Sequence, residues 1–184
     1  MANSLPSRLH HTAYVVKDLE ATRHFYEDTL GIPLVATWAE QEELFGKERT
    51  YCHCFFGLAD GSALAFFSFA NADDQAEFGP DLAPSPFRHV ALTVDKATQE
   101  ALERRIAVAG LEPPGTYVLE HGYCRSVYVT DPDGMIVEFT CDADNAEQVN
   151  AIRLNDAHST LKRWLAGDHT PNNDVRPHML EAIA

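Results

Sequence analysis

Two histidines and one glutamate combine the residue types of a metal site with matching positions in a repeated pattern. His11 begins the stretch His-Thr-Ala-Tyr-Val-Val, and His89 begins the similar stretch His-Val-Ala-Leu-Thr-Val, whereas His10 falls out of register with His89. Glu138 lies inside the apolar segment Met-Ile-Val-Glu-Phe, where an unpaired carboxylate costs several kcal/mol. Two imidazoles and one carboxylate bind Fe(II) in non-haem oxygenases and leave other coordination positions open. The sequence therefore predicts that His11, His89 and Glu138 bind a divalent metal ion.

Strand alternation predicts that these three side chains share one face. Successive residues of a strand point to opposite faces of its sheet. In the strand that begins at His89, every second residue from Val90 onwards is apolar, and we expect this set to pack against helices. Val137 and Phe139 suit the same side, so Glu138 is expected on the opposite face, which lines a cavity.

The elements around these residues repeat. We expect an α+β fold of two βαβββ modules that form a cup-shaped mixed sheet around a metal site. Module 1 covers about residues 8–70, a linker 71–87 and module 2 about 88–142, so that residues 1–142 make one domain and 143–184 a C-terminal helix and tail. In module 1 the pattern predicts strands at 9–16, 33–39, 50–58 and 63–69, a helix at 19–30 and a charged loop at 40–49; in module 2 it predicts strands at 88–94, 116–120, 124–130 and 135–141 and a helix at 96–109.

Charge and composition exclude several classes of partner. The formal net charge of −14 opposes binding to nucleic acid and to anionic membranes. No apolar segment is long enough to cross a bilayer, and residues 1–8 do not have the pattern of a signal peptide. The four cysteines lack CxxC spacing, so we expect reduced thiols and a cytoplasmic protein.

Aromatic residues are the candidates for the wall of a substrate pocket. His53, Phe55 and Phe67 have the alternation expected of the cavity face in module 1, and Phe55 occupies the position that Tyr128 occupies in module 2. These side chains suit a small aromatic substrate. In the last helix, Val149, Ile152 and Leu161 have the spacing of residues that pack against the body of the protein.

The paired modules, each with His-x-Ala near its start, resemble the vicinal oxygen chelate superfamily. That superfamily includes glyoxalase I, methylmalonyl-CoA epimerases, bleomycin- and fosfomycin-resistance proteins and extradiol dioxygenases. The resemblance covers about residues 8–142 and implies a homodimer. Its glyoxalase-like members use a fourth protein ligand from the last strand of the first module. Alignment of Asp60-Gly61 with Asp133-Gly134 places Ala65 opposite Glu138, so three ligands remain here.

The second module also resembles the extradiol dioxygenase signature. His121, Tyr128, Asp131-Pro132, Gly134 and Glu138 follow its spacing, and Leu119 is the one departure. This resemblance implies an Fe(II)-dependent dioxygenase, or one that uses Mn(II), which cleaves a catechol-like aromatic with O₂. His121 would act as acid and base, and Tyr128 would hydrogen-bond the substrate oxygen.

Two other functions remain open from the sequence. One is a metal-dependent lyase or isomerase like glyoxalase I or an epimerase, which would act without oxygen uptake. The other is a metal-free module that binds a small molecule, as in resistance proteins.

Overall fold

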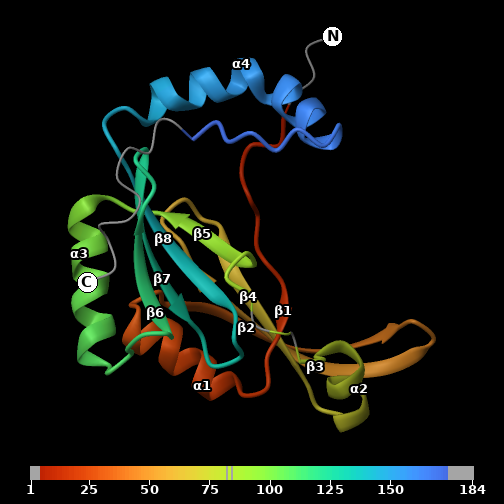
Figure 1. The fold of residues 1–184 in the computed structure, drawn as a ribbon. Coiled ribbons are helices and arrows are strands. Elements are labelled where there is room, and N and C mark those ends of the chain that lie inside the picture. Colours follow the sequence, from red (N-terminus) through yellow and green to blue (C-terminus); the bar gives the residue numbers. More distant parts are fainter. Residues whose placement is uncertain (1–4, 82, 84, 174–184) are drawn as a thin grey trace. The chain divides into compact units, whose positions relative to one another are not determined.

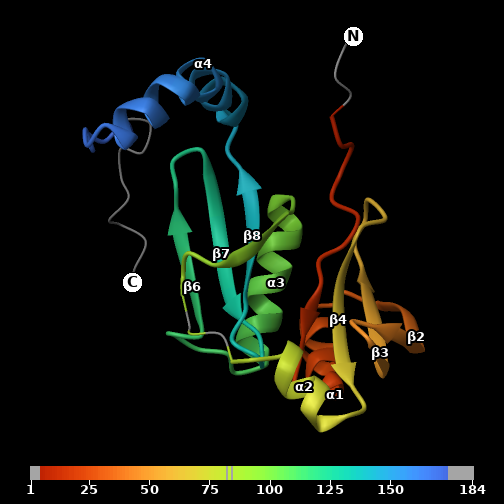
Figure 2. The same cartoon turned by 90° about the vertical axis from the view of Figure 1, so that its right-hand side faces the viewer.

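The computed structural model describes residues 5–81, 83 and 85–173. The chain forms two compact units, drawn in Figures 1 and 2, and each is described by itself. Unit 1 comprises Met1–Ser85 together with Asp131–Met135, and unit 2 comprises Pro86–Thr130 together with Ile136–Ala184. Each unit contains one four-stranded mixed sheet with helices, so the predicted α+β fold built on βαβββ modules is confirmed.

Unit 1 has the strand order β1-β4-β3-β2, in which β1 is parallel to β4 and the other pairs are antiparallel. Asp18 caps α1, because its carboxylate accepts hydrogen bonds from the N–H groups of Glu20 and Ala21. The elements are β1 (Tyr14–Val15), α1 (Leu19–Arg23), the π-helical segment η1 (His24–Thr29), β2 (Leu34–Leu44), β3 (Lys47–Gly57), β4 (Ala63–Phe69) and α2 (Ala72–Phe78).

The core of unit 1 is aromatic. Tyr26 is fully buried, and its ring centroid lies 4.8 Å from that of Phe66 and 5.5 Å from that of Phe56. The Tyr26 hydroxyl donates a hydrogen bond of 3.0 Å to Asp131. The segment Asp131–Met135, which contains the Asp-Pro-Asp-Gly turn, is part of unit 1, although the strands before and after it belong to unit 2.

The structure corrects two predictions, one in module 1 and one in the linker that follows it. The segment predicted as a charged loop, residues 40–49, continues the β2–β3 hairpin and turns at Phe45 and Gly46, which both have positive φ. Charged residues are tolerated there because the residues of this ribbon are mostly exposed, so an apolar pattern is not required. The linker predicted at residues 71–87 contains α2, which Asn71 caps through its side chain.

Unit 2 repeats the arrangement with the strand order β5-β8-β7-β6. Helix α3 packs on one face of the sheet (Figure 2), where Gln99 donates hydrogen bonds to the carbonyl oxygens of Arg125 and Phe139. We call this the helix face and the opposite side the open face. The elements are β5 (His89–Thr93), α3 (Lys96–Val108), β6 (Thr116–Glu120), β7 (Cys124–Thr130), β8 (Ile136–Asp142) and α4 (Ala146–Leu165).

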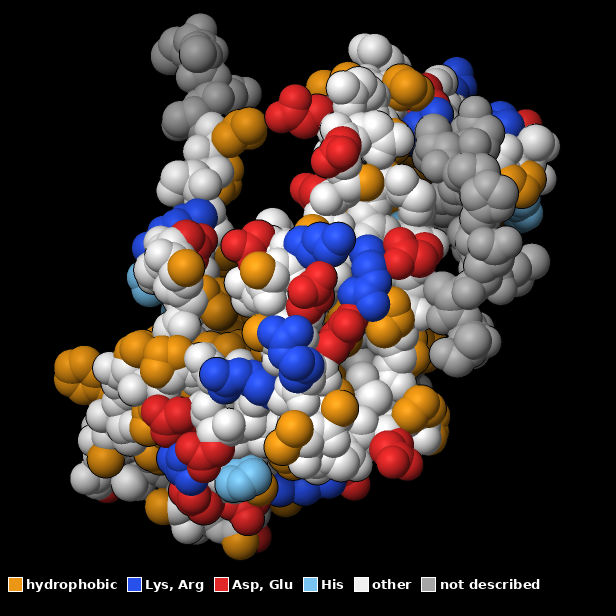
Figure 3. Space-filling view, turned by 90° about the vertical axis from the view of Figure 1, so that its left-hand side faces the viewer, with side chains coloured by type: hydrophobic (Ala, Val, Ile, Leu, Met, Phe, Trp, Pro, Cys, Tyr) orange, Lys and Arg blue, Asp and Glu red, His pale blue; other side chains and the backbone are white. Residues whose placement is uncertain are grey.

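Helix α4 packs against its unit less completely than its pattern predicts. Val149 is buried, but Ile152 and Leu161 are about half exposed, at 48% and 55%. No helix of the described residues has both the length and the apolar character for crossing a bilayer. Basic and acidic side chains are interspersed on the face shown in Figure 3, so the net negative charge does not form a uniform acidic surface there.

Candidate metal-binding residues

His89 and Glu138 face each other in unit 2. Strand β5 runs parallel to β8 and aligns Ala91 with Glu138, which brings the Nε2 atom of His89 to 2.9 Å from the Oε2 atom of Glu138. The Nδ1 atom of His89 lies 3.0 Å from the carbonyl oxygen of Pro86. A carbonyl oxygen only accepts, so Nδ1 carries a hydrogen in this contact.

This tautomer of His89 makes the His89–Glu138 pair suitable for binding a cation. With the hydrogen on Nδ1, a neutral His89 directs the lone pair of Nε2 at the Glu138 carboxylate. Two electron-pair donors repel each other at this distance unless a proton or a metal ion lies between them. Imidazole and carboxylate are both ligands of divalent first-row metals, so the donor set fits such an ion. In metal-binding histidines, the ring nitrogen that does not bind the metal typically donates a hydrogen bond to another group, as His89 Nδ1 does to the Pro86 carbonyl.

The other oxygen of Glu138 has different partners. Oε1 accepts hydrogen bonds from the Tyr128 hydroxyl at 2.8 Å and from the Thr140 hydroxyl at 3.0 Å. The Ser126 hydroxyl lies 3.2 Å from that of Thr140. All these side chains lie on the open face, because Tyr128 pairs with Glu138 and Ser126 with Thr140 across β7 and β8.

These contacts determine the charge state of Glu138. Its burial opposes ionisation, but the nearby hydroxyls of Ser126, Tyr128 and Thr140, and the positive charge of His89 when that ring is protonated, together hold the pKa of Glu138 below its ordinary value. Burial, followed by the hydrogen bond to Glu138, raises the pKa of Tyr128 well above its ordinary value. Glu138 is therefore an anion and Tyr128 a neutral hydrogen-bond donor near pH 7.

His121 extends the same network. Its Nε2 atom lies 3.1 Å from the Tyr128 oxygen, and because that hydroxyl donates to Glu138, His121 acts as the donor in this contact. The ring of Tyr117 stacks on the ring of Tyr128 with a centroid separation of 4.7 Å. The sequence does not single out Tyr117 directly. Its position in the alternation of β6 and its pairing with Tyr128 are the features that could have identified it as a residue of this network.

The remaining candidate residues come together in unit 1. The ring of His11 lies 5.6 Å from that of Phe55 and 6.1 Å from that of His53. His53 stacks on Phe67 at 3.7 Å, and burial lowers its pKa, so His53 is neutral near pH 7. The Nδ1 atoms of His11 and His10 are 2.7 Å apart.

His11 is therefore described in a different unit from His89 and Glu138. Among the residues that the structure describes, no three His, Cys, Asp or Glu side chains form a group that could hold a metal ion.

The strand predicted at residues 9–16 is also shorter than expected, since β1 covers only Tyr14–Val15 and His11 makes an isolated bridge to Ala63.

The register of the two sheets identifies the counterpart of Glu138 in unit 1. Phe55 pairs with Ala65 as Tyr128 pairs with Glu138, and the bridge from His11 to Ala63 corresponds to the pairing of His89 with Ile136. Ala65 is fully buried and has no donor atom in its side chain. Unit 1 thus offers no carboxylate at the position equivalent to Glu138.

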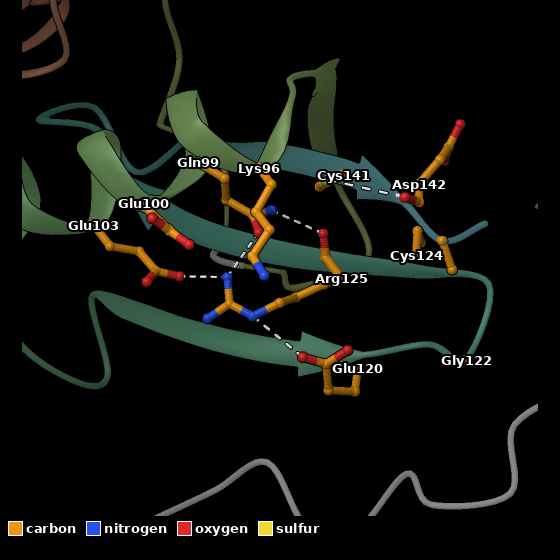
Figure 4. A pocket seen from close by; sticks show the side chains of 11 residues that line it. Lys96, Gln99, Glu100, Glu103, Glu120, Gly122, Cys124, Arg125, Cys141 and Asp142 are labelled. Carbon is orange, nitrogen blue, oxygen red and sulfur yellow. Dashed lines mark hydrogen bonds and ion pairs between the residues drawn. The ribbon is translucent and has the colours of Figure 1, made fainter.

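A pocket of about 490 Å³ lies elsewhere in unit 2 (Figure 4). Arg125 and Cys141 line it from the helix face, and Arg125 forms ion pairs with Glu103 and Glu120. The residues of the His89 and Glu138 network do not line this pocket. It is a feature of the opposite face of the sheet.

Comparisons with known proteins identify similar chains. The family model described as Glyoxalase/Bleomycin resistance protein/Dioxygenase superfamily matches residues 8–139. A probable lactoylglutathione lyase of Vibrio parahaemolyticus serotype O3:K6 is 29% identical over 133 residues, which cover 71% of this chain and 88% of that protein.

Solved structures share the fold. The fosfomycin resistance protein FosX of Listeria monocytogenes, in complex with Mn(II) and sulfate, is 19% identical with a TM-score of 0.55, and the match covers 80% of this chain and 99% of that one. Lactoylglutathione lyase of Agrobacterium tumefaciens is 23% identical with a TM-score of 0.51, and the match covers 75% and 96%. One structural relative of this chain therefore holds a divalent metal ion.

The prediction of an Fe(II)-dependent extradiol dioxygenase is wrong. The relatives described above are named lactoylglutathione lyase and fosfomycin resistance protein, which are not ring-cleaving oxidoreductases. The structure provides a physical reason for the misleading pattern. His121 and Tyr128, the residues that favoured the dioxygenase signature, form a hydrogen-bonded chain to Glu138, and that arrangement does not require a catechol or O₂.

Proposed function

We propose that this chain, which belongs to the Glyoxalase/Bleomycin resistance protein/Dioxygenase superfamily, is a metal-dependent enzyme of the lyase or isomerase type. Its substrate would be a small molecule whose oxygen atoms bind the metal, and O₂ would take no part. The observation that carries the proposal is the 2.9 Å approach of His89 Nε2 to Glu138 Oε2, two metal-binding atoms on one open face. Similarity to a probable lactoylglutathione lyase supports this class of reaction.

His89 and Glu138 are the proposed ligands in unit 2, and His11, which lies in unit 1, stays a prediction from the sequence. Mn(II) is the first ion to test because the FosX structure contains it, with Fe(II), Ni(II), Co(II) and Zn(II) as comparisons. A bound divalent ion would supply Lewis-acid polarisation of a substrate oxygen.

The chain's own residues prepare this site. The Pro86 carbonyl holds the His89 ring with Nε2 directed at the ligand position. The hydroxyls of Tyr128 and Thr140 keep Glu138 ionised and fix its Oε1 atom. His121 holds a hydrogen on Nε2 toward the Tyr128 oxygen and is proposed as the group that exchanges protons near neutral pH.

The first experiment measures metal binding and turnover in the same preparation. The full chain is stripped with a chelator, reloaded with each ion under anaerobic conditions and assayed for formation or cleavage of lactoylglutathione. We expect one ion per chain and metal-dependent activity that persists without oxygen. Failure of the stripped chain to bind any of these ions stoichiometrically would overturn the proposal.

A second candidate activity is chemistry on a phosphonate such as fosfomycin. Ala65 favours it, because the glyoxalase-like ligand set implied by the sequence resemblance needs a carboxylate at that position, and FosX is a structural relative that contains Mn(II). Loss of fosfomycin in the presence of the Mn(II)-loaded chain, without activity toward lactoylglutathione, would select this candidate. A homodimer likewise remains a proposal, which the mass of the protein in solution tests.

A further inference from the structure

The two carboxylate oxygens of Glu138 have unequal surroundings. Oε1 accepts from the hydroxyls of Tyr128 and Thr140, at 2.8 and 3.0 Å, whereas Oε2 faces His89 Nε2 at 2.9 Å. Two hydrogen bonds engage the lone pairs of one carboxylate oxygen. Only Oε2 is left with a lone pair directed at the ligand position beside His89.

We propose that Tyr128 and Thr140 are positioning residues that make Glu138 bind a divalent ion through Oε2 alone. A carboxylate binds a cation through either one or both of its oxygens. Binding through both would require Oε1 to give up its two hydroxyl donors inside a buried site, which costs free energy. The inference rests on the proposed function, because it presupposes a metal ion at His89 and Glu138.

The two hydroxyls are themselves held in place. The Tyr128 oxygen receives the Nε2 hydrogen of His121, and its ring is stacked on that of Tyr117. The Thr140 hydroxyl lies within hydrogen-bond distance of Ser126, whose side chain is fully buried. Tyr128 lies on β7 directly opposite Glu138, and Thr140 lies two residues from Glu138 on β8. The sheet therefore fixes the positions of both hydroxyl groups.

The consequence concerns the coordination positions available to substrate. Mn(II) prefers about six oxygen or nitrogen ligands. Each protein atom that binds the ion leaves one position fewer for substrate oxygens and water. Binding of both Glu138 oxygens would remove one of these positions.

The test counts water molecules on bound Mn(II). The full chain is loaded with Mn(II), and exchangeable waters are measured by magnetic resonance in ¹⁷O-labelled water, independently of any activity. We expect about one water fewer in the Tyr128→Phe/Thr140→Val double variant than in the wild-type chain, because Mn(II) keeps about six ligands while Glu138 turns to bind through both oxygens. Thr140→Ser, which restores a hydroxyl, should keep the wild-type number.

Two control variants distinguish an effect on the orientation of Glu138 from a general disturbance of the site. Tyr117→Phe removes a hydroxyl from the ring stacked on Tyr128, and Thr93→Val changes the residue paired with Thr140. Neither hydroxyl donates to Glu138 within the described residues, so both variants should keep the wild-type water number.

The possible outcomes are distinct. If wild-type chain binds no Mn(II), the proposed function fails. If it binds Mn(II) but the double variant holds as many waters as the wild type, only the positioning inference fails. Should the double variant not fold, the comparison of Thr140→Val with Thr140→Ser decides in the same way, since the two differ in the hydroxyl.

Discussion

Ala65 and Glu138 occupy equivalent positions in the two sheets, since Ala65 pairs with Phe55 and Glu138 pairs with Tyr128. Both residues are buried, but only Glu138 carries a carboxylate. Phe55 likewise lacks the hydroxyl that Tyr128 directs at its partner. The two units therefore share the same backbone pairing, but only unit 2 carries the carboxylate and the hydroxyl at these positions.

This asymmetry predicts that Glu138→Gln removes metal binding. The amide keeps the shape of the side chain but loses the charge that attracts a divalent cation. We expect Mn(II) affinity to fall by more than about 100-fold, since changes in outer groups alone cost about 10–100-fold. Isothermal titration calorimetry measures the loss. Glu100→Gln, an exposed change on α3, is the matched control and should bind Mn(II) like the wild-type chain.

The corrected function predicts independence from oxygen. Because the chain is expected to act as a lyase or isomerase, the Mn(II)- or Fe(II)-loaded protein should consume no O₂ with a panel of catechols. An oxygen electrode measures this directly. Turnover of lactoylglutathione or fosfomycin should proceed at the same rate in air and under nitrogen. Oxygen uptake that depends on both metal and catechol would contradict this prediction.

The Tyr26–Asp131 hydrogen bond predicts a pH-dependent loss of stability. Burial raises the pKa of Asp131 above its ordinary value of 3.8, while hydrogen bonds from Met135, Tyr26 and Asp133 oppose this. A raised pKa in the folded state means that the contribution of this group to stability is complete below pH 3.8 and is lost as pH rises through the folded pKa.

Tyr26→Phe removes one of the opposing donors and raises the pKa of Asp131 further. The variant should lose about 1–3 kcal/mol at pH 7, where the carboxylate is charged, and less near pH 4. Urea unfolding at the two pH values measures both losses. Tyr14→Phe serves as a control, and its effect should not depend on pH. An equal loss for Tyr26→Phe at both pH values would show that the hydrogen bond does not act through the ionised carboxylate.

A buried ion pair fastens α2 to the β2–β3 hairpin in unit 1. Asp74 and Arg49 are 1% and 5% exposed and form a direct ion pair, and the Arg49 guanidinium also lies 4.7 Å from the Phe78 ring centroid. Asp74→Asn leaves the Arg49 charge without its buried partner, so we expect a loss of about 3 kcal/mol in the free energy of unfolding.

Chemical denaturation monitored by circular dichroism measures this loss. Asp73→Asn changes the exposed neighbour in the first turn of the same helix and should cost less than about 0.5 kcal/mol. Similar losses for the two variants would contradict the importance of the buried pair.

Repetition made much of the fold predictable from the sequence. The similar stretches at His11 and His89 and the two Asp-Gly turns predicted two βαβββ modules, and the predicted membership of the superfamily is confirmed by the family match over residues 8–139. Alignment of the two Asp-Gly turns also predicted Ala65 as the counterpart of Glu138, and the register of the strands agrees with it. The continuation of the β2–β3 hairpin through residues 40–49 and helix α2 were missed, since their exposed residues carry no apolar pattern.

The sequence by itself determined which residue types occupy which strand positions, and therefore that Glu138 shares a face with Tyr128 and Thr140. Only the tertiary structure decided how these groups pair: that the Tyr128 hydroxyl donates to Glu138, that the Pro86 carbonyl fixes the His89 tautomer, and that Asp131 receives a hydrogen bond from Tyr26. Hydrogen bonds depend on distances of a few tenths of an ångström between atoms brought together by folding, and residue spacing along a chain does not specify those distances.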